Sequence, residues 1–154
     1  MALLKDNDRE QLSREFARLQ NPVKLVLFTS AEGCEYCGLT EQLLGEVAGL
    51  SDKITVQGHD FERDRDQVAQ YRIARVPALA IVRVENQVIQ GVDHAHDRDY
   101  GIRFYGVPAG YEFAALISDI FDVSRGESGL NEQSKAMLAQ LKEPLHLQVF
   151  STPT

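Results

Sequence analysis

Cys34 and Cys37 are the two cysteines of the chain, and their spacing is its first feature with evident chemistry. Two intervening residues place both thiols within bridging distance where a helix begins. The free N–H groups and the dipole of a helix N-terminus stabilise a thiolate, so a cysteine there ionises more readily than in solution. We therefore expect Cys34 to be a nucleophile and Cys37 to resolve a mixed disulfide formed at Cys34.

Charged residues and a proline accompany the pair. The negative charge of Glu35 should oppose ionisation of the thiol and favour a more reducing pair. Val76-Pro77 opens an apolar segment about forty residues further on, which predicts a cis bond opposite the thiols and backbone exposed to an extended substrate. An ordinary trans proline at the start of a strand is the alternative. Arg75 either faces the thiolate and offsets Glu35 or is a solvated surface charge.

Two other interpretations of the cysteine pair stay open. Two thiolates and the imidazoles of His94 and His96 would satisfy tetrahedral zinc, although these histidines lie far away in a polar segment. An inert structural bridge is the second alternative, against which a reducing compartment and the strand-to-helix junction both argue.

Periodic patterns predict the elements that position these residues. A nearly continuous apolar run at 23–29 predicts a strand buried on both faces, and a helical pattern follows from Cys34. The clearest amphipathic helix covers 113–121 and needs a sheet to pack on. Further patterns predict helices at 6–20, 64–72 and 132–141, strands at 54–61, 78–84 and 102–105, and a linker at 124–129.

Composition narrows the class of protein. The chain has 154 residues, about the length of one domain. Its 16 Lys and Arg against 23 Asp and Glu give a net charge of −7, which repels phosphate backbones and anionic lipids. We expect no nucleic-acid partner and no membrane partner. The 44% hydrophobic content is that of a globular protein, and the early charges at Lys5 and Asp6 do not fit a signal peptide. A cytoplasmic location follows as an expectation.

The end of the chain repeats its beginning. Residues 10–28 and 132–150 are identical at seven positions when aligned without gaps. Both copies read as a helix, a proline and a strand, the pattern of a duplicated unit. Chance resemblance of one helix and strand to another is the alternative. The second copy would place an unpartnered apolar strand at 145–150, which favours pairing with a neighbouring edge and homodimerisation.

The order of elements resembles an α/β thioredoxin-like fold, with a central mixed sheet of four or five strands flanked by helices. Three segments narrow the resemblance: residues 28–37 with the Cys-x-x-C motif, residues 71–77 ending in Val-Pro, and residues 102–125. They are similar to the N-terminal unit of the glutaredoxin-like protein disulfide oxidoreductases, which carry two such units in tandem. Thr-Pro-Thr at 152–154 matches the lead-in to the second Cys-x-x-C of that family.

The resemblance implies a thiol-disulfide oxidoreductase acting on protein disulfides or dithiols. Cys34 and Cys37 would be its catalytic pair, Tyr36, Val76 and Pro77 would contact substrate, and the redox disulfide would need no other cofactor. Glutathione or a thioredoxin-reductase-like flavoenzyme would be the electron donor. Residues 1–142 would form one unit, and 143–154 the first strand of a second, missing unit. A non-catalytic docking or scaffold unit of a two-unit oxidoreductase is the alternative.

Two features depart from the family pattern. Residues 85–100 look like a polar, irregular insertion with a short strand at 87–92. Leu27 and Phe28 occupy the neighbourhood where thioredoxins carry a buried aspartate. Proton transfer at Cys37 would then use Glu32 or water.

Overall fold

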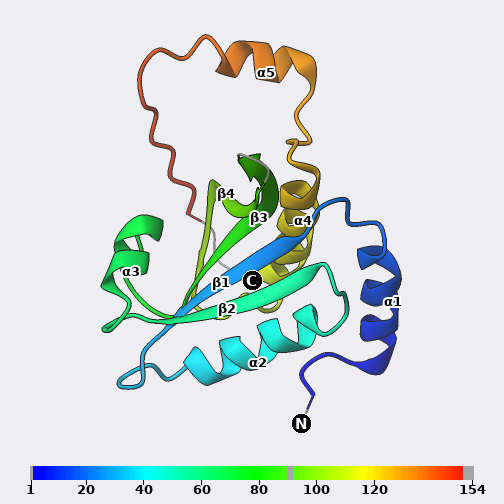
Figure 1. Cartoon of the computed structure of the whole chain (residues 1–154), viewed down its shortest axis with the longest axis vertical. Coiled ribbons are helices and arrows are strands. Elements are labelled where there is room, and N and C mark those ends of the chain that lie inside the picture. The colour runs from blue at the N-terminus through cyan, green and yellow to red at the C-terminus, as the bar shows by residue number, and fades with distance from the viewer. Residues whose placement is uncertain (1, 90–91, 151–154) are drawn as a thin grey trace.

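The computed structural model describes residues 2–89 and 92–150, with side chains described except at 86–95. Helices and strands alternate along the first part of the chain and then give way to a hairpin and two helices (Figure 1). In chain order they are α1 (Asp6–Phe16), β1 (Val23–Thr29), α2 (Cys37–Ala48), β2 (Ile54–Asp60), α3 (Arg65–Tyr71), β3 (Ala78–Ile89), β4 (Val92–Tyr105), α4 (Tyr111–Arg125) and α5 (Glu132–Leu138).

The strands form one mixed sheet of four strands in the order β2-β1-β3-β4. β1 pairs in parallel with β2 and antiparallel with β3, and β4 returns antiparallel to β3. This confirms the predicted fold class. Because β1 and β2 run in parallel, both of their carboxyl ends, at Thr29 and Asp60, lie at the same end of the sheet.

Apolar side chains cover β1 on both faces, as its sequence predicts. On one face, residues of α1, α2 and α4 pack against Leu25 and Leu27. On the other, Val68 and Tyr71 of α3 pack against Val26 and Phe28. Successive side chains of a strand point to opposite faces, so a strand between two layers must be apolar throughout.

The prediction that residues 85–100 are irregular is wrong, whereas their being an insertion relative to the family stays a prediction. β3 continues beyond the expected residue 84 to Ile89, and β4 begins at Val92, so the two strands form a long hairpin. Only the first part of β3 pairs with β1, from Ala78 to Arg83. Beyond it β3 pairs with β4, and this two-stranded arm lacks in its sequence the apolar alternation that reveals a half-buried strand.

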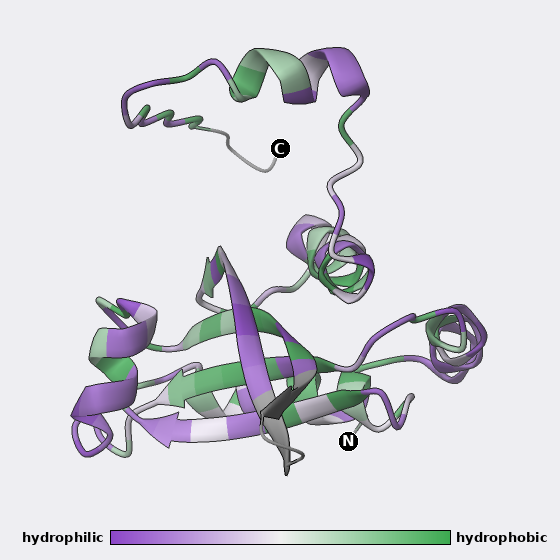
Figure 2. Cartoon of the chain, turned by 45° about the horizontal axis from the view of Figure 1, so that its top comes forward, coloured by the Kyte–Doolittle hydropathy of each residue, from purple (hydrophilic) through white to green (hydrophobic). Residues whose placement is uncertain are grey.

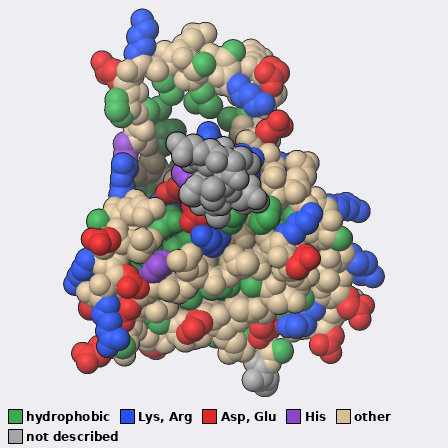
Figure 3. Space-filling view, in the orientation of Figure 1, with side chains coloured by type: hydrophobic (Ala, Val, Ile, Leu, Met, Phe, Trp, Pro, Cys, Tyr) green, Lys and Arg blue, Asp and Glu red, His purple; other side chains and the backbone are tan. Residues whose placement is uncertain are grey.

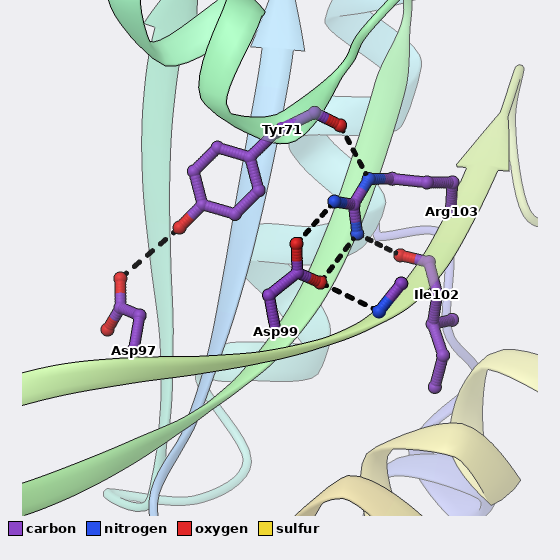
Figure 4. Close-up of polar contacts among 6 residues, drawn as sticks. Tyr71, Asp97, Asp99, Ile102 and Arg103 are labelled. Atoms are coloured by element: carbon purple, nitrogen blue, oxygen red, sulfur yellow. Dashed lines mark hydrogen bonds and ion pairs between the residues drawn. The ribbon is translucent and has the colours of Figure 1, made fainter.

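Polar contacts fasten this arm to the other elements (Figure 4). The Tyr71 hydroxyl donates to Asp97, whose carboxylate also pairs with Lys24 Nζ at 2.8 Å. The Arg103 guanidinium pairs with Asp99 and donates to the Tyr71 carbonyl. Burial and the neighbouring carboxylate of Asp97 raise the pKa of Tyr71 to about 12, so this hydroxyl stays protonated and remains a donor.

Several predicted helix boundaries also change, and two of the helices are shorter than expected, since α1 ends at Phe16 and α5 at Leu138. The helix expected from Cys34 begins at Cys37, because Cys34 to Tyr36 form a turn. The linker expected at 124–129 is too long, since α4 continues to Arg125. Gly126 caps the end of α4. Its φ of +74° lies in the left-handed region, and its N–H donates to the Asp122 carbonyl.

The repeated segment near the end of the chain lies apart from the sheet. α5 and the residues after it arch away from the body, and Figure 2 shows them separated from the hydrophobic central strands. Apolar side chains line this arch in the space-filling view (Figure 3). Residues 145–150 are exposed and belong to no strand in this chain. Their assignment to a second unit stays a prediction, and residues 151–154 lie outside the described part.

Candidate functional site

The loop between β1 and α2 carries Cys34 and leads to Cys37, the first residue of α2. Its first turn is held by Ser30, whose hydroxyl donates to the Glu32 carbonyl at 2.8 Å and accepts from the Glu32 N–H at 3.2 Å. Gly33 follows with a φ of +67°, a conformation that favours glycine. The loop therefore turns sharply at the end of the sheet and delivers Cys34 to the start of α2. Sequence reasoning did not single out Ser30 or Gly33.

Cys34 and Cys37 form a disulfide whose Cα atoms are 5.5 Å apart. The Cys37 N–H donates to the Cys34 carbonyl, which closes the turn between them. The two sulfur-bearing residues differ in exposure: Cys34 is half-buried, whereas Cys37 is 6% exposed. An outside reactant therefore reaches Cys34 more easily than Cys37.

The first turn of α2 is fixed by a buried threonine. The Thr40 hydroxyl donates to the Tyr36 carbonyl at 2.8 Å, and the Thr40 N–H donates to the same oxygen at 3.0 Å. Tyr36 itself projects outward and is 52% exposed. Thr40 thus secures the backbone that separates the cysteines. Its sequence signal is weak, because a threonine in the first turn of a helix is common.

The Val76-Pro77 peptide bond is cis, as the sequence predicts. Ala78 pairs with Phe28 across β1 and β3, so Pro77 lies where β1 leaves the sheet toward the cysteine loop. The Pro77 carbonyl accepts a hydrogen bond from Gly106 at 2.9 Å. Val76 is half-buried and takes part in no backbone hydrogen bond with another described residue. The topology therefore brings this bond and the cysteine loop to one end of the sheet.

The charged residues that the sequence singled out point elsewhere or outward. The Arg75 guanidinium lies over the Tyr105 ring, 4.9 Å from its centroid, at the end of β4. Glu35 and Glu32 are exposed, and the contacts that hold Glu32 run through its backbone. A role for Arg75 or Glu35 in tuning the thiolate, and for Glu32 in proton transfer, stays a prediction.

The histidines of the zinc interpretation lie in the hairpin arm. His96 is exposed on β4, and the His94 side chain lies outside the described part of the structure. Among residues whose side chains are described, no group of three His, Cys, Asp or Glu is arranged to hold a metal ion.

In the described part of the chain, too, no helix has the length and apolarity that a bilayer crossing requires.

Comparison with curated proteins gives a thioredoxin relative. A probable thioredoxin from Methanothermobacter marburgensis is 33% identical over 98 residues, which cover 63% of this chain and 94% of that protein. No protein-family model matches the sequence.

Two solved structures share the fold at detectable sequence identity. A protein disulfide oxidoreductase from Aeropyrum pernix K1 superposes with a TM-score of 0.72 and 28% identity, over 90% of this chain and 55% of that one. The NTD_N/C domain of the alkylhydroperoxide reductase AhpF from Enterococcus faecalis gives 0.73 and 26%, over 88% and 60%. The chain therefore spans little more than half the length of either solved chain.

Proposed function

Because the chain belongs to the thioredoxin family of thiol-disulfide oxidoreductases, we propose that Cys34 and Cys37 exchange disulfides with protein partners. The observation that carries this proposal is the disulfide between a half-buried Cys34 and a buried Cys37, at the sheet end that also holds cis-Pro77. In that arrangement an incoming disulfide meets Cys34 first.

The reaction proceeds in two exchanges. In the reduced protein the Cys34 thiolate attacks one sulfur of the substrate disulfide, which breaks and releases one substrate thiolate. Cys37 then loses its proton and attacks the Cys34 sulfur. The Cys34–Cys37 disulfide forms, the second substrate thiolate leaves, and the two electrons of the pair have passed to the substrate. The same steps in reverse oxidise a dithiol, so the redox disulfide serves without another cofactor.

Substrate backbone would lie along the turn at Val76 and Pro77. The unpaired backbone groups of Val76 offer an extended segment a donor and an acceptor beside the disulfide. Tyr36, between the two cysteines in the sequence, supplies an exposed ring for substrate contact. The negative charge of Glu35, next to Cys34 in the sequence, opposes formation of the thiolate, and Glu32 or water receives the Cys37 proton.

A separate reductant must renew the dithiol after each turnover. Glutathione and a thioredoxin-reductase-like flavoenzyme are the two candidates, and the likeness to part of an alkylhydroperoxide reductase supports a dedicated reductase. Titration of the pair against buffers from about −270 to −120 mV would separate a reducing from an oxidising role. The acidic composition and the low cysteine count support a cytoplasmic location.

The proposed mechanism is tested by insulin disulfide reduction with dithiothreitol as the electron source. Cys34→Ser should fall to the uncatalysed rate, because the thiol that remains, at Cys37, is buried away from the substrate. Pre-reduced Cys37→Ser, mixed with insulin after removal of dithiothreitol, should accumulate a mixed disulfide at Cys34, visible as added mass. Equal rates for wild type and Cys34→Ser would contradict the mechanism and favour the scaffold alternative.

The exposed apolar residues at 145–150 support a homodimer, in which this segment meets a second copy. Gel filtration before and after removal of residues 143–154 tests the contact. An unchanged elution volume would contradict it.

A further inference from the structure

An apolar groove lies beside the cysteine-bearing helix, and the mechanism above does not use it. Leu3 and Leu4 form one wall, Leu39 and Leu43 of α2 the second, and Val107 and Phe113 the third. We call it the N-terminal groove. Its volume of about 330 Å³ is at the lower end of the range for ligand pockets, so it suits one or two side chains better than a large cofactor.

One wall of the groove lies on α2, the helix that begins at Cys37. Residues four apart lie on the same face of a helix, so Leu39 and Leu43 share one face of α2, and Tyr36 immediately precedes the helix. Tyr36 lies between the cysteines, Leu39 is 40% exposed, and Leu43 is buried in the groove wall. The groove wall therefore begins two residues after Cys37, in the first turn of α2.

In the third wall, Phe113 belongs to α4, and Val107 lies in the loop between β4 and α4, which is hydrogen-bonded to Pro77. Gly106 donates to the Pro77 carbonyl, and Val107 is the next residue. The groove thus opens between the two elements that we assign to substrate contact, the first turn of α2 and the surroundings of Pro77.

The N-terminal segment is held in place by one carboxylate. Glu46 accepts from the Leu3 N–H at 2.8 Å and from the Leu4 N–H at 3.0 Å, and Arg9 pairs with the same group at 3.4 Å. Leu4 is buried in the core cluster, whereas Leu3 remains 40% exposed at the edge of the groove. The segment is therefore a fixed wall with an apolar residue presented to the outside.

We propose that the N-terminal groove binds an apolar side chain of the protein whose disulfide reacts at Cys34, and so selects substrates with a large aliphatic residue near the reactive cysteine. This inference rests on the proposed function and names its substrate class. A second copy of this chain is the competing occupant, and the substrate preference tested below separates the two.

The test uses two disulfide-linked peptide homodimers, so that both sulfurs are equivalent. The peptides differ only in carrying leucine or serine two residues from the cysteine. The fully reduced, full-length protein is mixed with each homodimer, and the second-order rate constant of reduction is measured. Wild type should prefer the leucine peptide by about tenfold, the effect of burying one such side chain.

Variants of two separate walls should remove the preference. Leu39→Asp and Leu3→Asp should bring the rate ratio close to one, whereas Met137→Asp, at an exposed apolar position on α5, should keep it. Glu46→Gln removes the carboxylate that holds Leu3 in place and should lower the ratio of the two rate constants. Glu41→Gln, on the other side of α2, is its control.

A wild-type ratio near one, or an unchanged ratio in both Leu39→Asp and Leu3→Asp, would overturn the groove assignment. Reduction of the serine peptide reports the proposed function by itself. A wild type that reduces neither peptide overturns the proposed function, and the groove assignment with it.

Discussion

Residues 10–28 and 132–150 share a sequence pattern but lie in opposite environments. In the first copy Leu25 is fully buried in the sheet, while its counterpart Leu147 is 80% exposed. The copies have in common a helix, a proline and an apolar segment. Only the first copy has neighbours that cover it, because β1 lies between β2 and β3 and beneath helices on both faces. Burial here is a property of the surroundings and not of the segment.

Position 26 shows how far the two sequences have diverged. Val26 faces the α3 side of the sheet and is buried there, whereas its counterpart is Gln148. The second copy keeps apolar residues at 145, 147 and 149, so its pattern fits a strand covered on one face. The apolar pattern of the first copy suits a strand at the centre of a sheet, whereas that of the second suits a strand at an edge or on a surface.

The largest expected difference between the copies comes from removing the matched leucines. Leu25→Ala leaves a cavity in the core and should lower the free energy of unfolding by about 2–5 kcal/mol. Leu147→Ala should change it by less than about 0.5 kcal/mol, because the side chain is already in water. Urea denaturation measures both. Comparable losses would mean that 145–150 is covered in solution.

A smaller effect is expected from the hydrogen bonds of Ser124, which hold the turn between α1 and β1 in the first copy. The buried Ser124 hydroxyl accepts from the N–H groups of Gln20 and Asn21 at 2.9 and 3.0 Å and donates to the Asn21 carbonyl. Ser124→Ala removes the partner of these partly buried backbone groups and should cost about 1–3 kcal/mol. Ser128→Ala, at an exposed position, is the control in the same denaturation experiment. Equal urea midpoints for both variants would contradict a stabilising role for the Ser124 hydrogen bonds.

The smallest effect depends on pH and concerns the segment before the first copy. Hydrogen bonds from the Leu4 and Leu3 N–H groups, then from Gln42, with the charge of Arg9, lower the pKa of Glu46 from 4.5 to about 2. The folded state therefore holds this carboxylate more firmly than the unfolded state does. Its contribution to stability is present above pH 4.5 and disappears as the pH falls toward 2.

Urea midpoints of wild type and Glu46→Gln between pH 6 and pH 2 measure this contribution. The two proteins should differ at pH 6 and converge toward pH 2, while Glu41→Gln should follow wild type throughout. A difference between wild type and Glu46→Gln that is constant with pH would show that the carboxylate charge is not what holds the segment.

The prediction from sequence succeeded where a signal is local. The continuous apolar run at 23–29 can only suit a strand between two layers, and the period of 113–121 fixes a helix with one buried face. The hairpin arm was missed because its strands pair mainly with each other. Backbone hydrogen bonds and the contacts of Asp97 and Arg103 hold it, and neither produces an apolar alternation in the sequence.

The sequence by itself determined the cysteine pair, its place between a strand and a helix, and the proline that forms the cis bond, because spacing and residue type encode these directly. Tertiary structure alone decided the exposure of Cys34 against Cys37, the approach of Pro77 to the cysteine loop, the groove beneath Leu3 and the exposure of the second copy. Each of these depends on which distant segment covers a residue, and that follows from packing between elements far apart in the chain.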